Sequence, residues 1–460
     1  MRQPADAQSS QQKQSDRKPA EVVPSTPAAG VSAGPAAPQA AGKVIEIDTP
    51  LGSPADPPPE LALARYRNLT QPTEDVARTY FMVDYISSSP FEWLPQLCPH
   101  GLPKQDAMSA AISAAALASL SLKMSDPRLM KHARKHYSNA LYHTNNALST
   151  TELAIQDSTL AAVLLLGLFE ALVFTGQQSL DSWNAHAIGT VELLRLRGTR
   201  QFQTPLGRRL FLHSSGNIRT SCAHTKRPVP PRFLKLYEDA KPLLDLSGPV
   251  HQVAPLNDRL ASLRSRIAQI EGQHRQELVL EALDLDAETV RIGQSVPEDW
   301  KFTARLPEES SPLTYKGISL RYPSLSAVRY WNSLRIIRMF LNDLIWAQSS
   351  LALNQGPDLD DDTDYEELQA LTARNMSTLV VEVLASCGEY LESSERRFSV
   401  TARCLIWPLS VIANASLAPQ DARQFASDCL ERLGRDCRIP ESIGLATGTH
   451  LICEAEWYVD

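Results

Sequence analysis

The sequence predicts an all-α protein, an irregular multi-helix body preceded by a disordered tail. Apolar residues recur every three or four positions from about residue 61 onward, and the alternating pattern typical of strands is scarce. No strict repeat of fixed period occurs, which disfavours a regular solenoid. We therefore expect two segments, a tail at 1–60 and an all-helical body at 61–460.

Composition sets limits on the function. The chain has 52 acidic and 45 basic residues and a net charge of −7, so the body is not expected to bind a nucleic-acid backbone strongly by itself. Its seven cysteines are scattered and never spaced Cys-x-x-Cys, which indicates reduced intracellular thiols. The first residues are polar and show no apolar stretch typical of a signal peptide.

The tail and the first strongly periodic helix differ in how much apolar surface they can bury. Residues 1–60 contain 11 of the 32 prolines and too little apolar surface to offset the entropy of ordering the chain. By contrast, the segment 131–148 has apolar or small residues at steps of three or four, which predicts one buried helix face. That face comprises Tyr137, Ala140, Leu141, Thr144 and Leu148.

Two helices are expected to follow. Asp157 or Ser158 is suited to be the N-cap of the first, and Gly176 would end it. Its apolar run, Leu160–Phe174, is shorter than the roughly 20 residues that a membrane helix needs, so it predicts a buried core helix. Gly198 is placed to close the second helix, which ends in LLRLR.

Polar and aromatic residues on these helices have expected packing partners. Trp183 and His186 lie one helical turn apart beside apolar residues, so we interpret them as packing residues, with ligand sensing as the alternative. Glu170 is isolated on a leucine-rich helix and is expected to pair with an arginine such as Arg197 or Arg335.

The second half of the body repeats the helical style. A helix of roughly 25 residues is expected to begin at Pro323, because apolar residues then recur every three or four positions. The segments at about 214–232 and 294–323 lack this period and contain Pro, Ser and Gly. We expect both to be loops.

Two clusters invite a metal-site interpretation. The acidic run from Asp358 to Asp364 contains Asp-Asp-x-x-Asp, the spacing of a diphosphate-binding magnesium motif, but no second metal motif follows. We interpret the run as a loop that caps a helix starting near Tyr365. His132, His136 and His143 share a helix face with three basic neighbours, which disfavours a dication. No catalytic, cofactor-binding or metal-binding residue is therefore assigned, and no nucleophile or phosphate-loop motif occurs.

An ordered set of motifs carries a family resemblance. A Tyr-x-x-Ala-Leu helix is followed by a leucine-rich helix ending in Phe-Glu, then Trp-x-x-His-x-x-Gly, Leu-Leu-x-x-Arg-Gly, and the later stretches YWNSLRIIRMFLNDLI and LIWPLSVIANASL. This set resembles the regulatory region of fungal zinc-cluster transcription factors. The signature residues, with a structural role, are Tyr137, Glu170, Trp183, His186, Gly189, Arg197, Gly198, Trp331, Arg335, Trp407 and Pro408.

The resemblance implies a nuclear transcription regulator with an all-helical fungal transcription factor regulatory domain at 61–460. The family's six-cysteine zinc cluster is not present, since the first cysteine is Cys98. Either the protein acts without its own DNA reader, or a coding segment for the cluster is missing. DNA binding stays open, and zinc is expected only with such an upstream cluster.

The expected partners are transcriptional co-regulators or a DNA-binding partner, and no membrane. Homodimerisation is usual in similar regulators, although no sustained heptad run supports it here. The expected function is transcription regulation of a pathway such as specialised-metabolite synthesis. Two alternatives stay open: a co-regulator of a complete zinc-cluster factor that does not itself bind DNA, and a helical metabolic enzyme.

Overall fold

Helices account for nearly all the secondary structure in the part of the chain that the computed structural model describes, residues 73–99, 106–173, 177–268, 275–305, 313–355, 363–392, 399–440 and 442–443. The predicted fold class is thus confirmed for these residues. The tail at 1–60 lies outside them. Residues 70–460 form one unit by their contacts.

The helices are α2 (Thr73–Tyr80), α3 (Ala107–Met124), α4 (Pro127–Leu148), α5 (Thr151–Ala154), α6 (Asp157–Leu172), α7 (Gln177–Arg197), α8 (Pro205–His224), α9 (Pro231–Ala240), α10 (Val253–Ile267), α11 (Arg275–Gln294), α12 (Leu325–Gln355), α13 (Tyr365–Ala385), α14 (Gly388–Glu392), α15 (Ile406–Asn414) and α16 (Gln420–Arg435). Strands β1 (Thr303–Arg305) and β2 (Ser319–Arg321) pair antiparallel, with Ala304 opposite Leu320. Short helical turns among the connections include η4 (Gly198–Gln203), η7 (Glu298–Trp300) and η8 (Tyr315–Gly317).

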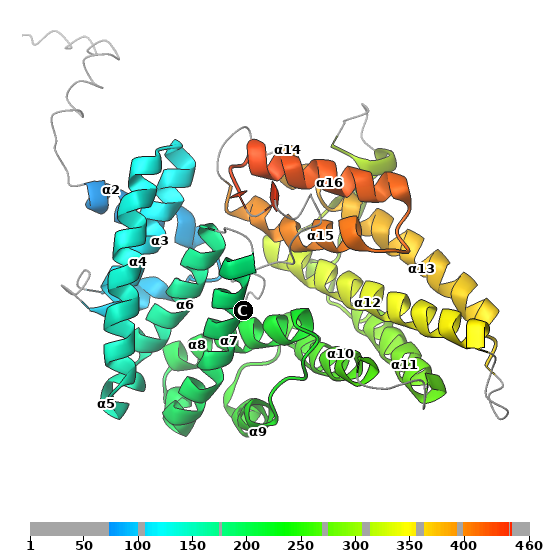
Figure 1. Cartoon of the computed structure of the whole chain (residues 1–460), viewed down its shortest axis with the longest axis horizontal. Helices are drawn as coiled ribbons and strands as arrows, with labels where there is room; N and C mark the ends of the chain where they lie inside the picture. The colour runs from blue at the N-terminus through cyan, green and yellow to red at the C-terminus, as the bar shows by residue number, and fades with distance from the viewer. Residues whose placement is uncertain are drawn as a thin grey trace, which may run out of the picture. The chain divides into compact units, whose positions relative to one another are not determined.

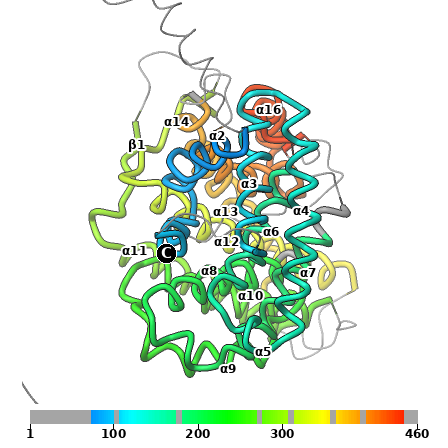
Figure 2. Tube along the Cα trace, turned by 90° about the vertical axis from the view of Figure 1, so that its left-hand side faces the viewer, coloured from blue at the N-terminus to red at the C-terminus, as the bar shows by residue number. Residues whose placement is uncertain are grey.

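Two groups of helices meet at α10. Helices α3, α4, α6, α7 and α8 pack on one another in the first half, whereas α11, α12 and α13 pack together in the second half, beside α15 and α16. Helix α10 contacts α8 on one side and α11 and α12 on the other. Figure 1 shows this arrangement, and Figures 1 and 2 both place α5 and α9 at the end opposite α16.

Helix α3 is buried around most of its circumference. Its alanines and serines are small, so α4 and α6 can approach it closely, and Asp106 caps it by accepting a hydrogen bond from the Ser109 backbone at 2.6 Å. Among the described helices, α3 is long and apolar enough to span a membrane by length and composition, but 72% of that stretch is buried inside the fold. Burial at this level is typical of a core helix.

Most of the predicted helices occur with small changes at their ends. The predicted buried face of α4 is confirmed at Ala140 and Thr144, whereas Leu148 is 43% exposed. Helix α6 is buried as predicted, but the N-cap expectation was wrong. Gln156 precedes the helix without a side-chain cap, and Asp157 is its first residue. The Asp157 carboxylate binds Arg197. Gly176 lies outside the described residues.

The predicted glycine stop at Gly198 is confirmed. Helix α7 ends at Arg197, and Gly198 has a φ of +58°, a left-handed conformation that glycine adopts without a Cβ clash. In the second half, α12 has 31 residues rather than roughly 25, and Ser324 rather than Pro323 caps it, through its hydroxyl and the Ala327 backbone N–H. Helix α13 begins at Tyr365 as predicted.

The prediction of a loop at 214–232 was wrong for the first half of that segment. Residues 214–224 belong to α8, and most of their polar side chains are buried. Ser214 donates to the Leu210 carbonyl at 2.7 Å, and Arg219 binds the Asp258 carboxylate of α10 at 2.8 and 2.9 Å. Tertiary partners therefore override the weak helix propensity of serine, asparagine and glycine here.

The second predicted loop, 294–323, is confirmed as non-helical apart from short turns in its described part. It contains the two-stranded ribbon of β1 and β2, which strand signals did not predict. Residues 306–312 within it lie outside the described residues. The loop between α8 and α9 is short, at 225–230.

Candidate functional site

The first signature residues meet between α4 and α6. The ring of Tyr137 stacks on Phe169 with centroids 4.4 Å apart, and the Tyr137 hydroxyl donates to the Glu170 carboxylate. Burial raises the pKa of both groups. The expectation that Glu170 pairs with Arg197 or Arg335 was wrong, because each of these arginines binds a different carboxylate and the Tyr137 hydroxyl satisfies Glu170.

Trp183 is a packing residue, as its position on α7 predicted. It is 1% exposed, and a Cβ placed on Gly167 of α6 would lie 3.5 Å from its indole, so this glycine leaves room for the ring. His186 is half-buried, and burial lowers its pKa. A Cβ placed on Gly189 would have no atom within 4 Å, so nothing around this position explains a glycine there.

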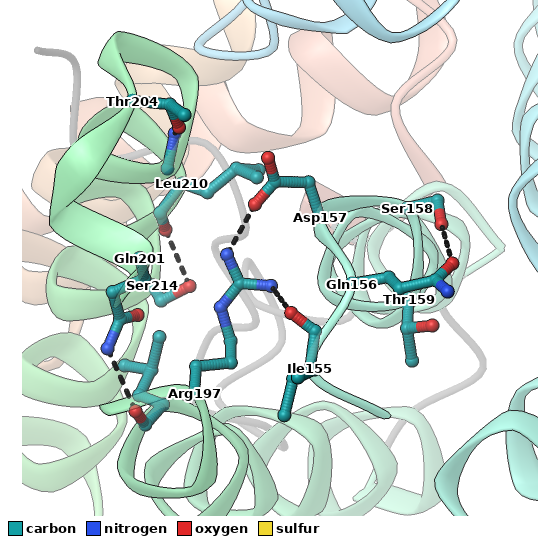
Figure 3. A network of polar contacts seen from close by, with 12 residues as sticks. Ile155, Gln156, Asp157, Ser158, Thr159, Arg197, Gln201, Thr204, Leu210 and Ser214 are labelled. Atoms are coloured by element: carbon teal, nitrogen blue, oxygen red, sulfur yellow. Dashed lines mark hydrogen bonds and ion pairs between the residues drawn. The ribbon is translucent and has the colours of Figure 1, made fainter. Parts of the chain in front are cut away.

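Arg197 ties the end of α7 to the start of α6. Its guanidinium is 3% exposed and binds the Asp157 carboxylate and the Ile155 carbonyl, the latter at 2.7 Å. Figure 3 shows it between these two groups. Next to it, Gln201 donates to the carbonyls of Leu194 and Gly198 at 2.9 and 2.7 Å, which satisfies the end of the helix.

Arg335 of α12 is held in a cage of aromatic rings. It is 2% exposed, and its Cζ lies 4.9 Å from the Phe302 centroid and 5.6 Å from that of Trp331. It donates to the Glu382 carboxylate at 2.9 Å and the Tyr322 hydroxyl at 2.6 Å. Two signature residues, Trp331 and Arg335, are thus in contact with each other.

A cavity of about 320 Å³ adjoins this cage, between α11, α12, α13 and the start of the ribbon. The charged side chains in its lining are Lys301, Arg335, Arg338 and Glu382. Arg338 binds Asp286 through two hydrogen bonds of 2.9 and 3.1 Å. All three cations that line the cavity therefore have carboxylate partners, and Lys301 binds a glutamate of η7. The cavity is therefore close to electrically balanced.

A second cavity, of about 200 Å³, lies where α10 and the end of α8 meet α12, α13 and α15. Trp407, a signature residue, lines it, and Pro408 is the next residue on α15 and is buried. Its charged lining residues are Lys226, Arg264 and Asp343. The sequence did not indicate Arg264, because no motif surrounds it. The cavity itself is formed by residues of five separate elements, which no local pattern brings together.

The metal-site interpretations find no support in the described residues, where no group of three or more His, Cys, Asp or Glu side chains could hold an ion. His136 instead contacts the Glu74 carboxylate at 2.9 Å. Asp364 caps α13 by accepting from the Glu367 backbone at 2.9 Å, as the capping interpretation predicted. The rest of the acidic run, 358–362, lies outside the described residues.

The cysteines in the described part of the chain are thiols rather than members of disulfides. Cys98 is half-buried, whereas Cys222, Cys387, Cys404, Cys429 and Cys437 are buried. Burial raises the pKa of Cys222 and of Cys429 to about 12, so both are thiols and not thiolates at neutral pH. Cys453 lies outside the described residues.

Comparisons with known proteins place most of the described body in one family match. The model of the "Fungal specific transcription factor domain" family matches residues 76–447. "Transcription factor dbaG" of Emericella nidulans is 22% identical over 374 residues, which is 75% of this chain and 83% of that protein.

A second relative, "Uncharacterized protein AN5342" of Emericella nidulans, is 27% identical over 170 residues. The match covers 34% of this chain and spans 36% of that relative's length. No solved structure matches. The roles of the individual signature residues within the family stay predictions. Because the family match runs from α2 past the end of α16, this chain belongs to the fungal-specific transcription factor domain family.

Proposed function

We propose that this protein is a nuclear transcription regulator that controls a pathway or a gene cluster, such as one for specialised-metabolite synthesis. The observation that carries the proposal is the family match over residues 76–447, together with a relative named as a transcription factor that aligns over 83% of its own length. The cavities described above lie among these helices, and no enzyme activity is part of the proposal.

Transcript profiling of a deletion strain against its parent tests this proposal. We expect a coordinated set of transcripts to change under conditions that express the gene, and the set would name the pathway. An unchanged transcriptome alongside a missing metabolite would reject regulation and favour the enzyme alternative. In that case, changing Asp360, Asp361 and Asp364 to alanine decides whether the acidic run carries activity.

Tethering tests the activity of the body directly. The full chain fused to a foreign DNA-binding domain is expected to alter transcription of a reporter. A silent fusion at normal abundance would contradict the proposal. The same chain fused to a fluorescent protein is expected to accumulate in the nucleus, where the exposed Lys226 and Arg227 and the basic face of α4 could bind an import receptor.

A second candidate function is that of a co-regulator without its own DNA reader. The chain carries 52 acidic and 45 basic residues, a balance that does not favour strong binding to a nucleic-acid backbone and so supports this candidate. Its partners would be a complete zinc-cluster factor, other co-regulators or a second copy of this chain. Electrophoretic mobility of DNA with the purified protein separates the two, because a sequence-specific shift without a partner rejects the co-regulator proposal.

A further inference from the structure

The smaller cavity combines an apolar wall with two cations. Its wall includes Met339, Phe340, Met376, Trp407 and Val411, contributed by α12, α13 and α15. Further lining residues come from the end of α8, the loop that follows it, and α10. A compound held here would therefore contact both groups of helices.

Arg264 enters this cavity without a carboxylate partner. Its guanidinium donates to the Ala223 carbonyl at 2.9 Å and lies over the Phe340 ring, with 4.3 Å from Cζ to the centroid. Arg264 forms no ion pair with a carboxylate of the described residues, although the Asp343 carboxylate is close enough to act on its charge. Burial lowers the pKa of Arg264 to about 10, although Asp343 opposes this. A desolvated cation of this kind favours an anion.

Lys226 supplies the second cation from the loop after α8. It is exposed and has no ion pair within the described chain, and its backbone has a φ of +53°. That left-handed backbone conformation is uncommon for lysine, and it changes the direction of the chain at the end of α8. In the larger cavity, by contrast, Arg335 and Arg338 already bind carboxylates.

We propose that this smaller cavity binds a small apolar monocarboxylate. Its carboxylate would accept hydrogen bonds from Arg264 and Lys226, and its apolar body would pack against Trp407 and Phe340. A volume of about 200 Å³ lies below the range of roughly 300–1,000 Å³ for drug-sized ligands, so one or two rings fit. Two cations face one carboxylate, Asp343, in the lining, which suits a single negative charge rather than a phosphate or a dianion.

The inference rests on the proposed function only for its biological use, as the effector of a transcription regulator. Binding itself is a property of the purified chain. If 2-naphthoate binds as described below while a deletion leaves the transcriptome unchanged, the proposed function fails and the site stands. If transcripts change and no binding occurs, the reverse holds.

The experiment compares 2-naphthoate with its neutral amide, 2-naphthamide, on the purified full-length protein by calorimetry and tryptophan fluorescence. We expect saturable binding of one naphthoate per chain and binding of the amide weaker by about tenfold or more, since the amide loses the charge-assisted contacts. Equal binding of acid and amide would overturn the anion assignment, and no binding of naphthoate at millimolar concentration would overturn the site.

Matched variants locate the binding. Arg264→Gln is expected to weaken naphthoate binding by about tenfold, whereas Arg266→Gln, on the same helix and paired with Glu281 outside the cavity, should leave it unchanged. Lys226→Asn removes a surface charge and keeps a residue that tolerates the left-handed backbone, with Arg227→Asn as its control. If Arg264→Gln fails to fold, the effect of Lys226→Asn on naphthoate binding decides whether the cavity is the binding site. Equal losses in the controls and the cavity variants would reject this location.

Discussion

Replacing Arg197 by glutamine tests whether the contact between α6 and α7 holds the first half of the body together. The Arg197 side chain is 3% exposed and that of Asp157 30%. Removing one partner of a buried pair typically costs about 3–5 kcal/mol, because the other charge is left without compensation. Water can reach part of the Asp157 carboxylate, so we expect a loss near the lower end, about 3 kcal/mol of unfolding free energy.

The same helix offers a matched control. Arg195 binds Glu192 at 2.8 Å, but the two side chains are 60% and 54% exposed. A surface pair of this type contributes about 0.5 kcal/mol or less, so Arg195→Gln should be nearly silent. The measurement is urea unfolding of the full chain followed by far-ultraviolet circular dichroism, comparing midpoints at unchanged slope. If the two variants differ by less than about 0.5 kcal/mol, the buried pair contributes no more than a surface one and the reasoning is refuted.

Three further predictions use the same denaturation assay unless stated. Gly198→Ala should lower the free energy of unfolding by about 1–2 kcal/mol because this position has a φ of +58°. Gly207→Ala should lower it further, since the added Cβ would lie 2.0 Å from a backbone oxygen. Gly189→Ala should instead stabilise the helix by about 0.5–1 kcal/mol. Equal effects at the three glycines would contradict this. Trp183→Ala should cost about 3–5 kcal/mol, and wild-type stability would refute its burial. Burial raises the folded pKa of Glu170, so its neutral form favours folding, and stability falls as pH rises from the unfolded pKa to the folded one. Glu170→Gln should therefore gain stability relative to the wild type as the pH rises through this window, and parallel pH profiles of the two proteins would contradict this.

Periodicity and capping chemistry were sufficient to predict much of the fold. The start of α13 at Tyr365 and the end of α7 at Gly198 both follow from local groups, a carboxylate that caps and a glycine without a Cβ. Residues 214–224 were misread because the stability of α8 there comes from distant partners. Arg219 reaches Asp258 on another helix, a contact that no local pattern indicates.

The candidate site was less predictable than the fold. The contact of Tyr137 with Glu170 joins two motifs that were each visible in the sequence, but their pairing was not, and an arginine seemed the better partner for a buried acid. The smaller cavity was not visible at all. Lys226 and Arg264 become neighbours of one space only when α8, α10 and α12 are packed, so their shared role depends on tertiary structure.

The buried thiols allow the frequency of local opening to be measured at several places in the fold. A thiol-specific reagent reacts with the thiolate, which an inaccessible side chain with a raised pKa does not provide, so each labelling rate reports how often its surroundings open. Cys222 lies next to Ala223 at the smaller cavity, and Cys387 and Cys429 lie in the core around α13 and α16. Mass spectrometry of their modification over time would therefore rank the opening of the cavity wall against that of the core, without any engineered label.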